Sequence, residues 1–132
     1  LTVSPMKSFV ALLPAAPCEP LDRLATETVR HFNRLRAPLS PEDRARRLAS
    51  PLIARQKAQL DAFGYPYIFD DFVFHMTLTG PLPVERQEPI RAALAAHYGP
   101  VDAPFAVDAL VVYRQARRED RFSVLTRVPL EG

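Results

Sequence analysis

The sequence predicts an α+β domain, with one mainly antiparallel sheet of about four strands and three to four helices packed on one face of that sheet. Two observations support this fold class. Four short segments have strand-like patterns, and stretches with helical periodicity separate them. The 132 residues, 48% of them hydrophobic, are sufficient for a single domain with its own core. The uncovered face of the sheet would then be a concave surface.

The chain is predicted to begin with a short buried strand from Ser8 to Leu13, which ends at Pro14. A helix should then run from Leu21 to about Leu35, because its apolar residues recur at helical spacing and its charged residues take the other face. Ala37-Pro38 ends this helix, since the residue before a proline avoids the helical conformation.

Two Ser-Pro pairs mark the starts of two further helices. Ser40-Pro41 supplies a capping serine and a first-turn proline, followed by two acidic residues, and predicts a short helix to about Leu48. Ser50-Pro51 repeats this signal and predicts a helix to about Phe63, with Gly64 as its stop.

The segment from Phe72 to Gly80 alternates with period two and is predicted to form a strand. One of its faces is apolar and can be buried, whereas the other carries an imidazole and hydroxyl groups. The apolar face comprises Phe72, Phe74, Met76 and Leu78, and the opposite face comprises Val73, His75, Thr77 and Thr79.

The C-terminal part is predicted to contain a helix from Glu85 to His97, which Gly99-Pro100 closes. Two alternating segments follow, Phe105 to Arg114 and Arg121 to Val128. The charged link from Gln115 to Asp120 makes these two segments a hairpin.

The charge balance and the cysteine content exclude several classes of protein. Lys and Arg total 17 against 15 Asp and Glu, a formal charge of +2, which is too balanced for a protein that coats nucleic acid. Cys18 is the one cysteine, so the sequence has neither a disulfide framework nor a cysteine-based zinc site. No apolar run approaches the roughly 20 residues needed to span a bilayer. We therefore expect a cytoplasmic protein without a membrane partner.

His75 and Thr77 are the first candidates for a functional site. They lie two residues apart on the polar face of one strand, roughly 7 Å apart and pointing the same way. An imidazole titrates near neutral pH, and a hydroxyl can donate to a phosphoryl oxygen. The alternative interpretation is a buried histidine that is hydrogen-bonded for structural reasons. The polar and apolar residues are segregated on the two faces of the strand, and this favours the functional interpretation.

This part of the chain resembles the two-histidine (2H) phosphoesterase superfamily, in particular its branch of phosphonate metabolism proteins. The resemblance lies in Gly64 to Tyr67 followed by Phe72 to Leu82, which is similar to the second histidine motif of that superfamily. Arg36 to Leu39, with Glu42 and Arg46-Arg47 after it, and the opening strand Phe9 to Pro14 are similar to the same branch.

The resemblance implies a two-lobed protein in which each lobe supplies one His-x-Thr or His-x-Ser pair to a central cleft. His75 would then be one of two catalytic histidines and Thr77 its phosphate-binding partner. The sequence has no second pair, because Phe32-Asn33 follows His31 and Tyr98-Gly99 follows His97. We therefore expect residues 1–132 to be a single domain that forms the C-terminal lobe of a longer protein.

Three further residues are candidates for substrate binding. Tyr65 and Tyr67 flank the entry to the strand and can bind a phosphate or a sugar, or they can form a rigid aromatic linker. Arg36 belongs to the branch-specific segment, and guanidinium matches phosphate geometry. The other candidates are weaker: the remaining basic residues are expected on solvated surfaces, His97 in the core, His31 at a helix edge and Cys18 without a catalytic partner. The basic residues in question are Arg34, Arg44, Arg46, Arg47, Arg117 and Arg118, whereas Arg114, at the end of a strand, is a weaker candidate for binding.

These residues together predict a metal-independent phosphodiesterase, a hydrolase that needs no cofactor. Two imidazoles on opposite sides of one phosphorus can act as base and acid, and two hydroxyls can bind the non-bridging oxygens. The resemblance suggests a small cyclic phosphodiester such as a phosphoribosyl cyclic phosphate. The alternative is a catalytically silent lobe that binds a phosphate ester or an RNA end. Expected partners are a small phosphorylated substrate and either the missing N-terminal lobe or a second copy of the chain; nucleic acid is not expected as a partner.

Overall fold

The computed structural model describes residues 1–99 and 105–130. The chain divides into two compact units, Leu1–Asp102 and Ala103–Gly132. The first unit holds the five main candidates for a functional site: His75, Thr77, Tyr65, Tyr67 and Arg36. Each unit is described by itself.

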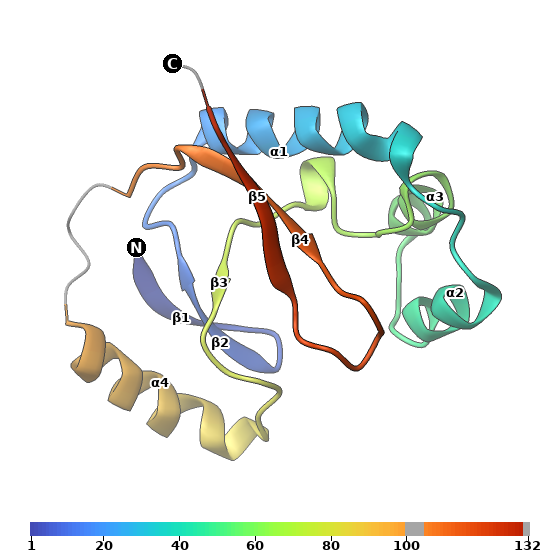
Figure 1. Cartoon of the computed structure of the whole chain (residues 1–132). Coiled ribbons are helices and arrows are strands. Elements are labelled where there is room, and N and C mark those ends of the chain that lie inside the picture. The colour runs from blue at the N-terminus through green and yellow to red at the C-terminus, as the bar shows by residue number, and fades with distance from the viewer. Residues whose placement is uncertain (100–104, 131–132) are drawn as a thin grey trace. The chain divides into compact units, whose positions relative to one another are not determined.

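The predicted α+β class is confirmed, with four α-helices and two small antiparallel sheets among the described residues (Figure 1). The predicted single sheet of four strands is instead a sheet of three strands and a separate hairpin. The elements in chain order are β1 (Thr2–Met6), β2 (Phe9–Leu13), α1 (Glu19–Phe32), the 3-10 turn η1 (Asn33–Leu35), α2 (Pro41–Leu48), α3 (Ala54–Phe63), the 3-10 turn η2 (Phe69–Asp71), β3 (Met76–Thr77), α4 (Val84–Tyr98), β4 (Ala109–Arg114) and β5 (Ser123–Pro129).

The sheet of the first unit has the order β1-β2-β3, and both pairings are antiparallel. β1 and β2 form a hairpin in which Met6 pairs with Phe9, so two residues make the turn. β2 is the central strand, and on its other side Ala11 pairs with Thr77 and Leu12 with Met76.

The sequence analysis did not predict β1. Pro5 lies inside this strand, opposite Val10, and a proline cannot donate a hydrogen bond to a sheet. The strand forms because it lies at the edge of the sheet, where it pairs with β2 alone among the described strands.

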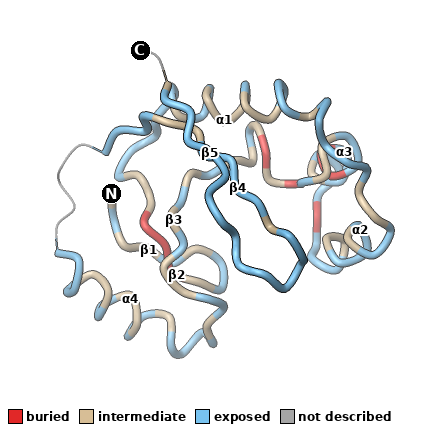
Figure 2. The backbone as a smooth tube through the Cα atoms, in the orientation of Figure 1, coloured by how far each residue is buried: buried red, intermediate tan, exposed pale blue. Residues whose placement is uncertain are grey.

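The core of the first unit is built around β2 and α3, where the buried residues gather (Figure 2). Val10 and Leu60 are fully buried, and Ile68 is nearly so. Helix α4 contacts β1 and β2, so it covers part of this sheet. Burial of these aliphatic side chains provides most of the driving force for the fold of this unit.

The predicted Ser-Pro start signal is correct for α2 and wrong for α3. Ser40 caps α2 as predicted, because its hydroxyl accepts a hydrogen bond from the amide of Asp43 at 3.1 Å. Ser50 does not cap α3, which begins at Ala54. The side chain of Gln56 instead accepts a hydrogen bond from the amide of Ile53 at 3.2 Å and so closes the first turn.

The C-terminal helix α4 extends one residue beyond the prediction at each end, and Gly99 caps it with a positive φ of 64°. Pro100, the other half of the predicted stop signal, lies outside the described residues. In the second unit the predicted hairpin is confirmed, although β4 begins at Ala109 rather than Phe105. No helix within the described ranges is both long and apolar enough to cross a membrane.

Candidate functional site

The strand that carries His75 and Thr77 is shorter than predicted. Regular strand pairing is confined to Met76–Thr77, although the amides of Leu78 and Thr79 still donate to the carbonyl of Val10, and His75 directly precedes the first paired residue. The predicted alternation holds nevertheless. His75 and Thr77 are exposed, whereas Phe74 and Met76 are half-buried. His75 and Thr77 are therefore both accessible to solvent, as a site requires, although Ala11 beside Thr77 is fully buried.

Thr79 ends the strand although it belongs to the same predicted face. Its Oγ1 accepts a hydrogen bond from the amide of Val10 at 3.0 Å and donates one to the carbonyl of Gly80 at 2.9 Å. The hydroxyl oxygen of Thr79 thus accepts the hydrogen bond of the Val10 amide, which a backbone carbonyl would accept if the strand continued. Thr79 is therefore a structural residue, and Thr77 is the hydroxyl of this segment that stays available.

A row of small and hydroxyl-bearing residues crosses the sheet on this face. Ser4 pairs with Ala11, and Ala11 pairs with Thr77. Residues directly opposite in antiparallel strands project to the same face, so the hydroxyls of Ser4 and Thr77 flank a single methyl group. Thr2 lies on this face as well, and its Oγ1 is 3.3 Å from Oγ of Ser4. We call Thr2, Ser4, Thr77 and His75 the hydroxyl face.

The imidazole of His75 has a fixed orientation. Its Nδ1 lies 2.8 Å from the carbonyl oxygen of Val73, and since a carbonyl can only accept, Nδ1 carries the proton. Nε2 has no hydrogen-bond partner within residues 1–99 and 105–130 and is free for a ligand. The ring packs against Phe9 of β2, with a distance of 5.7 Å between the ring centroids.

Tyr65 and Tyr67 form a cluster with two cations. Their rings meet edge to face with centroids 5.7 Å apart. Nζ of Lys7 lies 3.7 Å from the centroid of the Tyr67 ring, and the guanidinium carbon of Arg47 lies 4.8 Å from that of Tyr65. Such contacts bind cations to aromatic faces. Among the described residues neither tyrosine forms a hydrogen bond or a ring contact with His75 or Thr77, and the connection runs through the hairpin of β1 and β2 that carries Lys7 and Phe9.

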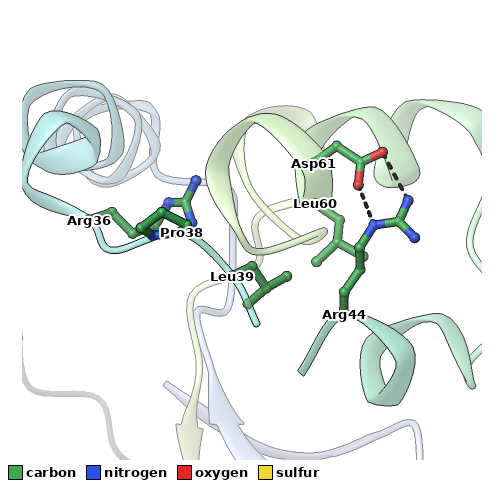
Figure 3. Close-up of a pocket in the computed structure, with 6 residues that line it drawn as sticks. All are labelled: Arg36, Pro38, Leu39, Arg44, Leu60 and Asp61. Carbon is green, nitrogen blue, oxygen red and sulfur yellow. Dashed lines mark hydrogen bonds and ion pairs between the residues drawn. The ribbon is translucent and has the colours of Figure 1, made fainter. Parts of the chain in front are cut away.

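Arg36 makes no hydrogen bond to the hydroxyl face among the described residues and has partners of its own. Its guanidinium donates to Oδ1 of Asn33 at 3.2 Å and to the carbonyls of Ala37 at 3.0 Å and Ala62 at 3.4 Å. These bonds tie the segment after α1 to the end of α3. Arg36 also lines a cleft of about 300 Å³, whose other lining residues are Pro38, Leu39, Arg44, Leu60 and Asp61 (Figure 3).

Ion pairs neutralise several exposed arginines, among them Arg44 and Arg46, which the sequence placed on solvated surfaces. Arg44 forms two hydrogen bonds to Asp61, at 2.8 and 3.3 Å, and these lower the pKa of the Asp61 carboxyl (Figure 3). Arg55 binds Asp71 in the same two-bond manner, at 2.9 Å for each, and with help from Gln56 it lowers the pKa of Asp71. These charges are neutralised within the protein.

The other candidates do not gather into a site. His97 is exposed and packs on Tyr98, which corrects the prediction that it is a core residue: α4 presents this side chain to solvent at its last turn. His31 is exposed on α1 as expected, and Cys18 is exposed. No group of three or more potential metal ligands occurs within the described part of the chain.

The structure adds residues that the sequence analysis did not propose. Lys7 lies beside Tyr67, Phe9 lies beside His75, and Ser4 lies across the sheet from Thr77. Each of these residues lies far from its partner in the sequence. The Met6–Phe9 turn carries no glycine or Asn-Gly signal that would have revealed the hairpin.

Comparisons with known proteins give one family and one curated relative. A family profile described as "Protein of unknown function (DUF1045)" matches residues 1–123. The chain is 36% identical over 135 residues to the protein named ribose 1,5-bisphosphate phosphokinase PhnN of Janthinobacterium sp. (strain Marseille). This match covers 98% of the chain and 30% of the relative, so the chain spans less than a third of the relative's length. No solved structure matches.

The name of this relative corrects the prediction that the chain is a hydrolase. A phosphokinase transfers a phosphoryl group between two organic molecules, whereas a hydrolase transfers it to water. The comparison therefore points to phosphoryl chemistry of another class.

Proposed function

The chain belongs to the DUF1045 family, and on that premise we propose that it is a lobe that binds a phosphorylated sugar in phosphonate-related phosphoryl chemistry. One observation carries the proposal. His75 has a fixed ring with Nε2 free, and the exposed hydroxyl of Thr77 lies two residues away on the same face. Protonated imidazole and hydroxyl both donate to phosphate oxygens, and charged partners make such bonds strong.

A binding lobe agrees better with these residues than a complete enzyme does. The sequence has one His-x-Thr pair, so a second imidazole for proton transfer on the opposite side of the phosphorus is absent. It also lacks the G-x-x-x-x-G-K-[ST] loop with which many kinases bind the phosphates of a nucleotide. These 132 residues, which span 30% of the relative, do not by themselves account for the chemistry named for it.

The ligand class follows from two sources. The relative is named for a phosphorylated ribose, and the sequence resembles proteins that act on small phosphate esters. We propose a ribose phosphate as the ligand. The resemblance to two-histidine phosphoesterases favours a cyclic phosphodiester as a second ligand of the same face, bound there without being cleaved by this lobe.

The proposal is tested by calorimetric titration of the chain with ribose 5-phosphate, and with ribose as the uncharged comparison. His75→Ala and Thr77→Val should each weaken binding of ribose 5-phosphate by about tenfold, the value of one charge-assisted hydrogen bond. His31→Ala and Thr26→Val are controls, because they remove an imidazole and a hydroxyl from α1, another element of the same unit. They should leave the affinity unchanged.

Two results would contradict the proposal. Equal affinity of the His75→Ala variant and the unchanged protein would show that phosphate is bound elsewhere. Tighter binding of a 3′-phosphorylated oligoribonucleotide than of ribose 5-phosphate would favour recognition of an RNA end.

A further inference from the structure

Lys7 occupies a strained position in the turn between β1 and β2. Its φ is +54°, in the left-handed region that residues with a Cβ avoid, and Phe69 is the other non-glycine residue with a positive φ within the described ranges. The carbonyl of Lys7 accepts a hydrogen bond from Nε2 of Gln87 on α4 at 3.2 Å. Such strain persists where the surroundings hold it, and it is concentrated at functional sites.

The side chain of Lys7 is held in place but keeps its charge available. Its ammonium lies 3.7 Å from the centroid of the Tyr67 ring, and Tyr65 supports that ring from its edge. No acidic side chain pairs with Lys7 among the described residues. The aromatic contact fixes the ammonium on one side, and its donors remain free to bind an anion.

The hairpin links Lys7 to the hydroxyl face. Lys7 lies in the turn directly before β2, and the ring of Phe9, the first residue of β2, contacts the ring of His75. The same short segment thus carries the ammonium and the ring that touches the imidazole. A ligand with two separated negative groups could contact both.

We infer that Lys7, held on Tyr67, is a second phosphate-binding position, and that the natural ligand carries two phosphate groups. This inference rests on the proposed function, which assigns the first phosphate to His75 and Thr77. An ammonium binds phosphate as a point charge and needs no fixed hydrogen-bond plane. On this inference, the conformational strain of the turn is retained because it holds the Lys7 ammonium where the second phosphate binds.

The test compares the affinities for ribose 1,5-bisphosphate and ribose 5-phosphate by calorimetric titration. The unchanged protein should bind the bisphosphate at least about tenfold more tightly, since a second charged contact is added. Lys7→Met should abolish this preference and leave the affinity for ribose 5-phosphate unchanged. Lys57→Met is the matched control, because Lys57 is the other lysine of the chain and lies exposed on α3.

A second variant protects the test against misfolding. Glycine adopts a positive φ without strain, so Lys7→Gly should fold and should lose the preference for the bisphosphate as well. Loss of the preference in both variants, together with a normal result for Lys57→Met, supports the inference.

The remaining outcomes separate the two proposals. If ribose 5-phosphate binds in a His75-dependent way and Lys7→Met keeps the preference for the bisphosphate, or no preference exists, the second position is wrong and the proposed function stands. If the preference depends on Lys7 but binding does not depend on His75, the Lys7 position stands and the first site is wrong. If neither sugar phosphate binds, both proposals are overturned.

Discussion

The guanidinium of Arg36 lies so close to the backbone of Gly64 that a Cβ at residue 64 would come within 2.8 Å of Nη1. The same guanidinium donates to the carbonyl of Ala62 in the last turn of α3. The sequence proposed Arg36 for substrate binding, and the structure gives it contacts that close the end of a helix. Its binding role stays a prediction.

Gly64→Ala is expected to destabilise the first unit by more than about 1 kcal/mol. The φ of Gly64 is +73°, and the added methyl group would also push Arg36 out of its hydrogen bonds. Chemical denaturation followed by circular dichroism measures this loss. Gly80→Ala is the control, because nothing lies within 4 Å of its added Cβ and its φ is not positive. Equal stability of the two variants would contradict the close packing described here.

Asp71→Asn should flatten the pH dependence of stability at the acid end. Hydrogen bonds from Arg55 and Gln56 lower the pKa of Asp71 in the folded protein. The stabilisation is therefore complete above the unfolded pKa of about 3.9 and is lost as the pH falls through the lower folded pKa. Thermal unfolding between pH 7 and pH 2 tests this.

Asp61→Asn is the control for that experiment. The Asp61 carboxyl has the same kind of partner, Arg44, but its side chain is 52% exposed, against 10% for Asp71. Solvent screens the more exposed pair, so its removal should change the loss of stability at low pH less. A larger effect at Asp61 would show that exposure does not govern these pairs.

Leu60→Ala should cost about 2–5 kcal/mol of unfolding free energy. Leu60 is fully buried in the core of the first unit, so truncation loses its burial and leaves a cavity. Leu35→Ala removes the same atoms from a side chain that is 71% exposed and should change stability by less than about 0.5 kcal/mol. Urea denaturation of both variants gives the comparison, and similar losses would place the core elsewhere.

Lys7→Gly should be more stable than Lys7→Met by about 1 kcal/mol. Both variants lose the contact with Tyr67, but glycine also relieves the positive φ of the turn. Their midpoints of thermal unfolding measure the difference. If methionine proves equal to glycine at this position, the turn is not strained.

The sequence was sufficient for what depends on local pattern. Alternation from Phe72 to Thr77 predicted which side chains are exposed, and Ser40 predicted the start of α2. The hairpin of β4 and β5 followed from two alternating segments and a charged link. These features arise from periodicity and capping, which neighbouring residues determine.

The features that the sequence did not predict depend on distant partners. The length of β3 is set by where β2 lies beside it and by the hydroxyl of Thr79. The contacts of Lys7 with Tyr67 and of Arg36 with Gly64 join separate elements. β1 was not predicted because it contains Pro5. A strand tolerates a proline only when it lies at the edge of a sheet, and this position depends on distant parts of the chain.

The antiparallel pairing of β2 with β3 has a consequence for the order of folding. β1 and β2 are joined by a two-residue turn, whereas the contact of Val10 with Thr79 joins residues 69 positions apart. Closing a long loop costs more entropy, so the hairpin can form early and the segment with Thr77 joins it later. The proposed recognition of a phosphate ester would thus become possible only at a late stage. A ligand that binds this face should slow unfolding and leave the earliest collapse unaffected.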